Sequence, residues 1–189
     1  MNKIRLLLLG ALSVAVTAQA ALNVGESAPQ FEARASLDGS AFDYSLAEAL
    51  EEGAVVVYFY PSAYTRGCNI QAHEFSVNMD EFKAAGASVI GVSLDSIERL
   101  NDFSADPDYC AGNLAVASDP DGSIAKSFDL NVRDGREGAE DTRGVEIGHG
   151  FAERVTFIVT SDGKVAETIG GVSPMENVKL SLEAVQKLN

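Results

Sequence analysis

Two short runs of apolar residues, separated by an amphipathic stretch, form the clearest pattern in the chain. Residues 54–60 are apolar throughout and rich in valine and aromatic residues, and residues 88–94 are similar. Such runs predict strands that are buried on both faces, as in a parallel sheet. Between them, apolar residues recur at spacings of three and four, which predicts a helix over about residues 65–85. Together these elements form a βαβ unit, whose crossover we expect to be right-handed.

The remaining pattern adds further strands, helices and one long loop. It predicts an extended segment at 24–31, a hairpin turn at 37–40, helices at 45–52, 97–103, 123–128 and 174–188, and strands at 114–117, 154–160 and 165–169. Residues 133–150 are charged, glycine-rich and aperiodic, which predicts an exposed loop. A βαβ unit followed by a hairpin and a final helix indicates an α/β protein with a thioredoxin-like fold, in which helices flank a central mixed sheet.

The first twenty residues have the pattern of an export signal. Lys3 and Arg5 precede an apolar stretch over residues 6–16, and small residues occupy positions 18 and 20. This arrangement predicts a secretory signal peptide that is cleaved after Ala20 and an export route to a bacterial periplasm. An uncleaved anchor is the alternative. We therefore expect one domain over residues 21–189, with no later segment apolar enough to cross a membrane.

Charge and cysteine content narrow the classes of function. The chain has a formal charge of −14, and removal of Lys3 and Arg5 leaves 12 basic residues against 28 acidic ones, or −16. Such a surface repels nucleic acid and anionic lipid, so neither is an expected partner. Two cysteines are present, Cys68 and Cys110. In an oxidising compartment the pair indicates either one structural disulfide or a redox couple.

Cys68 has a placement that favours chemistry. It follows the apolar run 54–60 by a short turn and falls in the first turn of the predicted helix, where free backbone N–H groups and the helix dipole favour a thiolate. Thr65 is placed to cap this helix, and Pro61 would end the strand and shield the floor of a pocket. The alternative is that Cys68 is a small buried hydrophobic residue.

Arg154 is the candidate cation for this thiolate. It stands at the start of the predicted strand 154–160, at a position where an ordinary buried strand would carry an apolar residue. The alternative is an arginine at a strand edge with no catalytic role. We expect the fold to bring Arg154 close to Cys68.

The chain resembles a known family at these residues. Pro61-x-x-x-Thr65-x-x-Cys68 matches the Pro-x-x-x-Thr-x-x-Cys signature of the peroxiredoxins. The segments 25–31, 118–122 and 154–157 also resemble peroxiredoxin landmarks and occur in the family's order. The resemblance extends from about Val24 to Leu188 and is strongest to the bacterioferritin comigratory protein, or PrxQ, subgroup.

The resemblance implies a thiol-dependent peroxidase that reduces hydrogen peroxide and small organic hydroperoxides. Cys68 would be the peroxidatic cysteine, which becomes a sulfenic acid. Arg154 and Thr65 would bind the peroxide oxygens, and Pro61 would close the pocket. The resemblance implies no metal, flavin or haem cofactor, recycling by a thioredoxin-like or glutaredoxin-like reductant, and a monomer, although some relatives are dimers.

One position departs from the subgroup. Many of its members carry a resolving cysteine five residues after the peroxidatic one, where this chain has His73, and Gln71 occupies a position that is often glutamate. Cys110 is therefore the candidate resolving cysteine. Resolution by an external thiol, or a buried Cys110 without a role, are the alternatives. A disulfide requires Cα atoms within about 7 Å. Where Cys68 and Cys110 lie farther apart in the resting fold, we expect the chain near Cys68 to unwind locally before the two sulfurs join.

Other functions and sites stay open at this point. A thiol–disulfide oxidoreductase of the same fold would use Cys-x-x-Cys, but Gln71 stands at the fourth position. A non-enzymatic peroxide sensor would use the same residues. His73 is expected to face solvent, and His149 to have no catalytic role. The two histidines and two cysteines lack the spacing of a zinc site. Tyr64 is a candidate for the pocket entrance.

Overall fold

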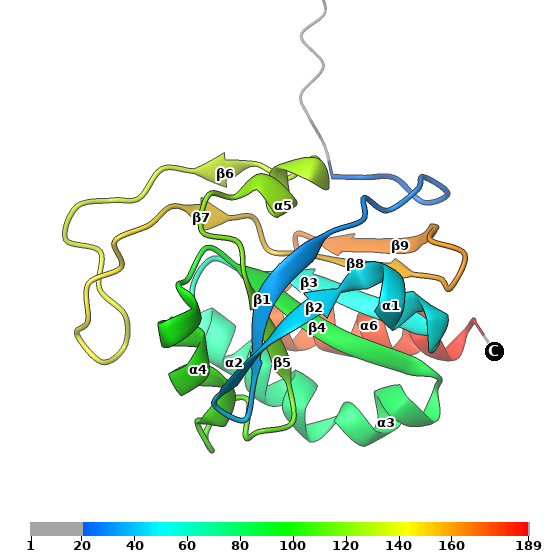
Figure 1. Cartoon of the computed structure of the whole chain (residues 1–189), viewed down its shortest axis with the longest axis horizontal. Helices are drawn as coiled ribbons and strands as arrows, with labels where there is room; N and C mark the ends of the chain where they lie inside the picture. Colours follow the sequence, from blue (N-terminus) through cyan, green and yellow to red (C-terminus); the bar gives the residue numbers. More distant parts are fainter. Residues whose placement is uncertain (1–20, 189) are drawn as a thin grey trace, which may run out of the picture.

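The protein is described by a computed structural model over residues 21–188, so the predicted signal peptide at 1–20 lies outside the described residues. The main strands are β1 (Glu32–Leu37), β2 (Ser40–Ser45), β3 (Ala54–Phe59), β4 (Ala87–Ser93), β5 (Ala115–Ser118), β8 (Val155–Val159) and β9 (Val165–Gly170). Within 21–188 they form one sheet in the order β2-β1-β5-β4-β3-β8-β9 (Figure 1). A separate ribbon joins β6 (Val132–Arg133) to β7 (Phe151–Ala152).

The sheet is mixed, as the sequence predicts. Strands β3, β4 and β5 run parallel to one another, whereas β1 and β8 join them as antiparallel neighbours. The hairpin between β1 and β2 turns at Asp38 and Gly39, which both have positive φ. Two consecutive residues with positive φ match the twist of the flanking strands, which is why Asp-Gly favours this turn. The thioredoxin-like arrangement is thus confirmed.

The helices are α1 (Leu46–Glu51), α2 (Arg66–Val77), α3 (Met79–Ala84), α4 (Ile97–Ala105), α5 (Ser123–Ser127) and α6 (Pro174–Gln186). The prediction of one helix over 65–85 was wrong, because the chain breaks at Asn78 into α2 and α3. The Asn78 side chain donates to the carbonyl of Glu74 at 2.7 Å. An asparagine amide that bonds nearby backbone competes with the regular helical pattern.

Alternation along the central strand divides the core into two layers. Val55, Val57 and Phe59 pack on the side of α1 and α5, in one apolar cluster. Val56, Tyr58 and Tyr60 point to the opposite side, into a cluster with buried residues of α2, α3, α4 and α6. Both cysteines belong to this second cluster, so the sheet places them on the same face.

The long loop, defined here as residues 134–150 between β6 and β7, is held at both ends. Arg133 pairs with Phe151 in the ribbon, so the loop begins one residue later than expected. Its tip is exposed, but Ala139, Asp141 and Ile147 are buried, so the loop packs against the domain and is only partly exposed. Within residues 21–188, every helix is too short or too polar to cross a membrane.

Candidate active site

Cys68 lies in the first turn of α2 and is 2% exposed. Arg154, directly before β8, donates from Nη2 to the sulfur of Cys68 at 3.2 Å. Gly67 directly precedes Cys68 in α2, and a Cβ at position 67 would lie 3.1 Å from the same Arg154 nitrogen. The absence of a side chain there lets the guanidinium approach the thiol. The expected pairing of Arg154 with Cys68 is therefore present.

A buried chain of amides orients Arg154. Its Nη1 donates to Oε1 of Gln71 in α2. The amide of Gln71 donates in turn to Oδ1 of Asn177 at 2.8 Å, and the Thr156 hydroxyl donates to the same oxygen at 2.7 Å. Asn177 completes the chain by donating to the carbonyl of Ile169 at 3.1 Å. Gln71, Thr156 and Asn177 are each fully buried, so every bond in this chain limits the orientation of the guanidinium.

Thr65 occupies the N-cap position of α2, as the sequence predicts, but its side chain makes no capping hydrogen bond. Instead its hydroxyl donates backward to the carbonyl of Ser62 at 2.8 Å. Pro61 lines a shallow pocket with Ala139 of the long loop and Phe151 of β7. Among the described residues, the sulfur of Cys68 receives its hydrogen bond from Arg154 rather than from Thr65.

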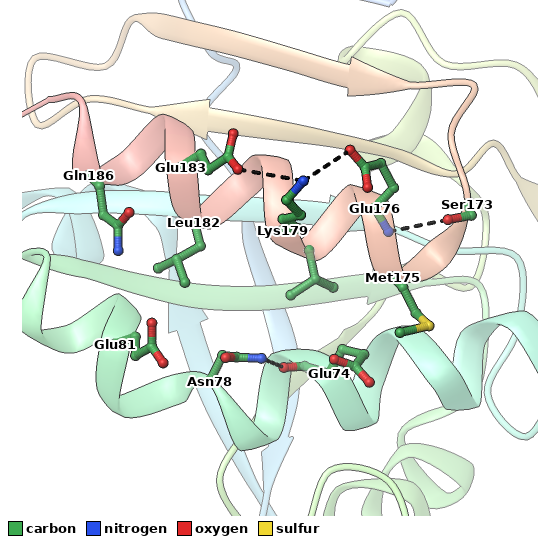
Figure 2. Close-up of a pocket in the computed structure, with 11 residues that line it drawn as sticks. Glu74, Asn78, Glu81, Ser173, Met175, Glu176, Lys179, Leu182, Glu183 and Gln186 are labelled. Carbon is green, nitrogen blue, oxygen red and sulfur yellow. Dashed lines mark hydrogen bonds and ion pairs between the residues drawn. The ribbon is translucent and has the colours of Figure 1, made fainter.

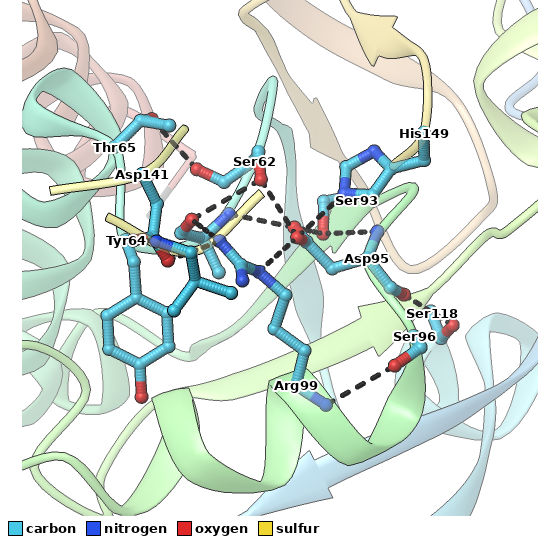
Figure 3. A network of polar contacts seen from close by, with 12 residues as sticks. Ser62, Tyr64, Thr65, Ser93, Asp95, Ser96, Arg99, Ser118, Asp141 and His149 are labelled. Carbon is cyan, nitrogen blue, oxygen red and sulfur yellow. Dashed lines mark hydrogen bonds and ion pairs between the residues drawn. The ribbon is translucent and has the colours of Figure 1, made fainter. Parts of the chain in front are cut away.

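The turn that leads into α2 is fixed by a buried carboxylate. Asp95 is fully buried and accepts from the Ser62 hydroxyl at 2.8 Å and from the Ala63 N–H at 2.7 Å (Figure 3). It also accepts from Ser93 at 2.7 Å and faces Nε2 of His149 at 2.9 Å. Burial would raise the pKa of Asp95, but the hydrogen bond and charge of His149, with the other donors, lower it.

His149 is consequently a structural ion-pair partner at this turn. Its Nδ1 lies 2.7 Å from the carbonyl of Gly150, and its Nε2 lies 2.9 Å from Asp95. Both ring nitrogens face acceptors, so only the imidazolium form donates to both. Burial and the nearby Arg99 oppose the charged form, yet the bonds to Asp95 and Gly150 raise the pKa of His149. Sequence reasoning missed this role, because a lone histidine in an aperiodic loop carries no local signal.

Cys110 is fully buried in the turn after α4, and both cysteines are free thiols. Its carbonyl accepts from the Ser76 hydroxyl of α2 at 2.8 Å. Burial raises the pKa of the Cys110 thiol well above its ordinary value, and Asp106 adds to this. Tyr58 belongs to the same buried cluster as both cysteines. Burial raises the pKa of its hydroxyl well above the ordinary value, and a negative charge on Cys110 or Cys68 would raise it further.

Comparison with known proteins places this geometry in a family. Residues 24–168 match the model of the AhpC/TSA family. The chain belongs to the AhpC/TSA family. Peroxiredoxin Bcp of Escherichia coli is 36% identical over 111 residues, which cover 59% of this chain and 64% of that relative. A Mycobacterium tuberculosis relative, also named as a peroxiredoxin, is 34% identical over 144 residues, or 76% of this chain and 82% of its own.

A solved structure of an AhpC/TSA-like relative supports the same assignment. Xanthomonas campestris Peroxiredoxin Q superposes with a TM-score of 0.64 at 26% identity, over 82% of this chain and 89% of that one. The homologues are thus of the Bcp and PrxQ type, which is the subgroup that the sequence resembles. The signature residues Pro61, Thr65 and Cys68 lie on the turn and helix start described above.

A groove elsewhere on this AhpC/TSA chain is separate from the cysteine site. It runs between α2, α3 and α6, and Figure 2 shows the acidic and amide side chains along it. On the α6 side of the groove, Nζ of Lys179 lies 3.8 Å from a carboxylate oxygen of both Glu176 and Glu183. Cys68 and Arg154 do not line this groove. The candidate active site is therefore the start of α2 at Cys68 and not this groove.

Proposed function

We propose that this protein is a thiol peroxidase, which reduces hydrogen peroxide and small organic hydroperoxides at Cys68. The observation that carries the proposal is the 3.2 Å contact between the Arg154 guanidinium and the Cys68 sulfur at the N-terminus of a helix. A guanidinium and free backbone N–H groups together favour the thiolate, which is the nucleophilic form of cysteine. Membership of the AhpC/TSA family and relatives named peroxiredoxins support the same reaction.

The first step is a two-electron transfer from sulfur to peroxide. The Cys68 thiolate attacks one peroxide oxygen, the S–O bond forms as the O–O bond breaks, and the other oxygen leaves as water or alcohol after taking a proton. Arg154 stabilises the negative charge that develops on the leaving oxygen. The Thr65 hydroxyl donates its hydrogen bond to the carbonyl of Ser62, so its oxygen is left to accept a hydrogen bond from the protonated peroxide oxygen. Pro61 closes the turn on the side of the long loop.

Cys110 is the proposed resolving cysteine. Its sulfur attacks the sulfenic sulfur of Cys68, a disulfide forms, and the hydroxyl leaves as water. The two residues share one buried cluster, and the carbonyl of Cys110 is bonded to Ser76 of the same helix. Because burial raises the pKa of Cys110, its thiol is a weak nucleophile until this region opens. A thioredoxin-like or glutaredoxin-like dithiol then reduces the disulfide.

The proposed compartment of the protein rests on its sequence pattern, and the expected monomer rests on its resemblance to the peroxiredoxins. We propose export to a periplasm, supported by the charged, apolar and small-residue pattern of residues 1–20. We expect a monomer that contacts neither nucleic acid nor, after cleavage, the membrane. Cell fractionation and the intact mass of the recovered protein test the export: a cytoplasmic protein that retains residues 1–20 contradicts it.

The function is tested by stopped-flow consumption of peroxide by the purified protein and by Cys68→Ser. We expect fast consumption of peroxide only by the wild-type protein. Equal rates for the wild-type protein and Cys68→Ser would refute the proposal. Sustained turnover with a dithiol separates an enzyme from a sensor, which would oxidise once and stop. An insulin-reduction assay separates the peroxidase from a general thiol–disulfide oxidoreductase, which would reduce insulin efficiently.

A further inference from the structure

Tyr64 holds an unusual backbone conformation at the start of the active site. Its φ is +61°, in the left-handed region that bulky residues rarely adopt. Its side chain is 2% exposed and packs edge-on against Phe103 and Tyr109, at 5.0 and 5.7 Å between ring centroids. Tyr64 directly precedes Thr65, where α2 begins. A strained residue persists only where its surroundings fix it, so the contacts around Tyr64 bear on the position of Cys68.

The backbone of Tyr64 is held by the long loop. Its carbonyl accepts from the N–H of Thr142 at 2.9 Å and from the hydroxyl of Thr142 at 2.7 Å. Asn69, the residue after Cys68, donates to the same hydroxyl oxygen at 3.5 Å. A single exposed threonine thus links the strained residue to the first turn of α2.

The ring of Tyr64 is covered by the neighbouring residue of the same loop. The Arg143 guanidinium lies over it, with 3.2 Å between the guanidinium carbon and the ring centroid. Arg143 is held there by Asp141, which its Nη2 contacts at 2.9 Å. A guanidinium above a partly desolvated aromatic face is attracted by the ring quadrupole.

Asp141 also connects the loop to the residue before Tyr64. Its carboxylate is buried and accepts from Nη2 of Arg99 in α4 at 2.7 Å. The same Arg99 nitrogen donates to the carbonyl of Ala63 at 2.9 Å. The carbonyls of Ala63 and Tyr64, and the ring of Tyr64, are therefore fixed by groups that lead back to the loop.

We propose that Asp141, Thr142 and Arg143 form a clamp that holds Tyr64 in its left-handed conformation and so positions the first turn of α2, with Cys68, against Arg154. This inference rests on the proposed peroxidase function and assigns these three as positioning residues for it. Without the clamp, Tyr64 relaxes toward negative φ, and the chain that follows it rotates. The contact between Cys68 and Arg154 then loosens, and the peroxide step slows.

The test compares Thr142→Val with Thr142→Ser in the full chain. Valine keeps the shape but removes the hydroxyl that bonds the Tyr64 carbonyl, whereas serine keeps it. We expect the rate constant for oxidation of Cys68 by peroxide to fall several-fold for Thr142→Val and to stay near wild type for Thr142→Ser. Combined with Arg143→Gln, the loss should reach about tenfold, since small displacements at a reacting centre have effects of this order. Arg34→Gln, which removes the same charge from an exposed position on β1, is the matched control.

The outcomes separate the clamp from the function. A wild-type protein as slow as Cys68→Ser refutes the proposed function itself. An active wild type with an equally fast Thr142→Val, Arg143→Gln double variant overturns the clamp. If the double variant melts at a lower temperature but oxidises at the wild-type rate well below its Tm, the loop is only structural and the clamp is again refuted. Slower oxidation in a folded double variant, with an unaffected Arg34→Gln, supports the clamp.

Discussion

Gln71 accepts a hydrogen bond from Arg154, and through that bond it sets the direction of the guanidinium that contacts Cys68. The two residues are far apart in the chain. They meet where the first turns of α2 face the segment that joins β7 to β8. Gln71 is itself fixed by Asn177 of α6. The electrostatic site at the thiol therefore depends on three elements of the fold and not on α2 alone.

Gln71→Met should separate orientation from charge. Methionine has a similar length but removes both hydrogen bonds, so Nη1 of Arg154 loses its acceptor and Oδ1 of Asn177 keeps only the bond from Thr156. We expect the oxidation rate of Cys68 to fall about tenfold, because a misoriented guanidinium loses much of its effect on the developing charge. The free energy of unfolding should fall by about 1–3 kcal/mol, the cost of unsatisfied buried groups. Stopped-flow kinetics and urea unfolding measure both. The exposed His73→Met on the same helix is the control, and equal rates for the two variants would contradict the prediction.

Arg154→Lys tests whether charge alone is sufficient. Lysine keeps a positive charge, but its single ammonium group cannot match the planar fork that contacts Gln71 and Cys68 together. We expect the peroxide step to slow by about 10²-fold, the scale of losing one donor to a developing oxyanion. Single-turnover oxidation monitored by intact mass gives the rate. A lysine variant as fast as wild type would show that only the charge matters.

His149→Gln should change how stability depends on pH. The pKa of His149 is raised in the folded protein, so its imidazolium contributes stability that is fully present below the unfolded value, about 6.5. That contribution is lost as the pH rises through the folded pKa. The stability gap between wild type and His149→Gln should therefore be larger at pH 5.5 than at pH 9. Asp95 and Gly150 favour the cation here, and Arg99 opposes it.

Urea unfolding at the two pH values measures this gap, with His73→Gln as the matched control. At the higher pH we expect a remaining difference of about 1 kcal/mol, the net value of an ordinary hydrogen bond. A gap that is independent of pH would mean that the pKa of His149 is the same in the folded and unfolded protein, which contradicts the prediction.

Cys110→Ala should leave the first chemical step intact and remove the second. After one equivalent of peroxide, we expect the wild-type protein to lose two hydrogens as the disulfide forms. The variant should gain one oxygen as a sulfenic acid, and excess peroxide should carry it to the sulfinic acid. Intact mass spectrometry distinguishes these products. A loss of two hydrogens in neither protein would point to an external resolving thiol.

The sequence alone determined most of the local elements and pointed to Cys68 as the candidate nucleophile. Apolar runs and three–four spacing predict β3, β4 and the buried face of α2, since burial on two faces or on one helical face imposes those periods. Cys68 at a helix start follows from the same pattern. The break at Asn78 escaped prediction, because the apolar spacing continues through it while a side-chain bond to Glu74 interrupts the backbone.

Only the tertiary structure decided what surrounds the thiol. Gln71, Asn177 and Thr156 meet because β8, α2 and α6 pack together, and no spacing within any one element signals that meeting. The same is true of Thr142 at Tyr64 and of His149 at Asp95, which join the long loop to the turn before α2. Local periodicity records which face of an element is buried, whereas hydrogen bonds between distant segments depend on how the chain returns to the sheet.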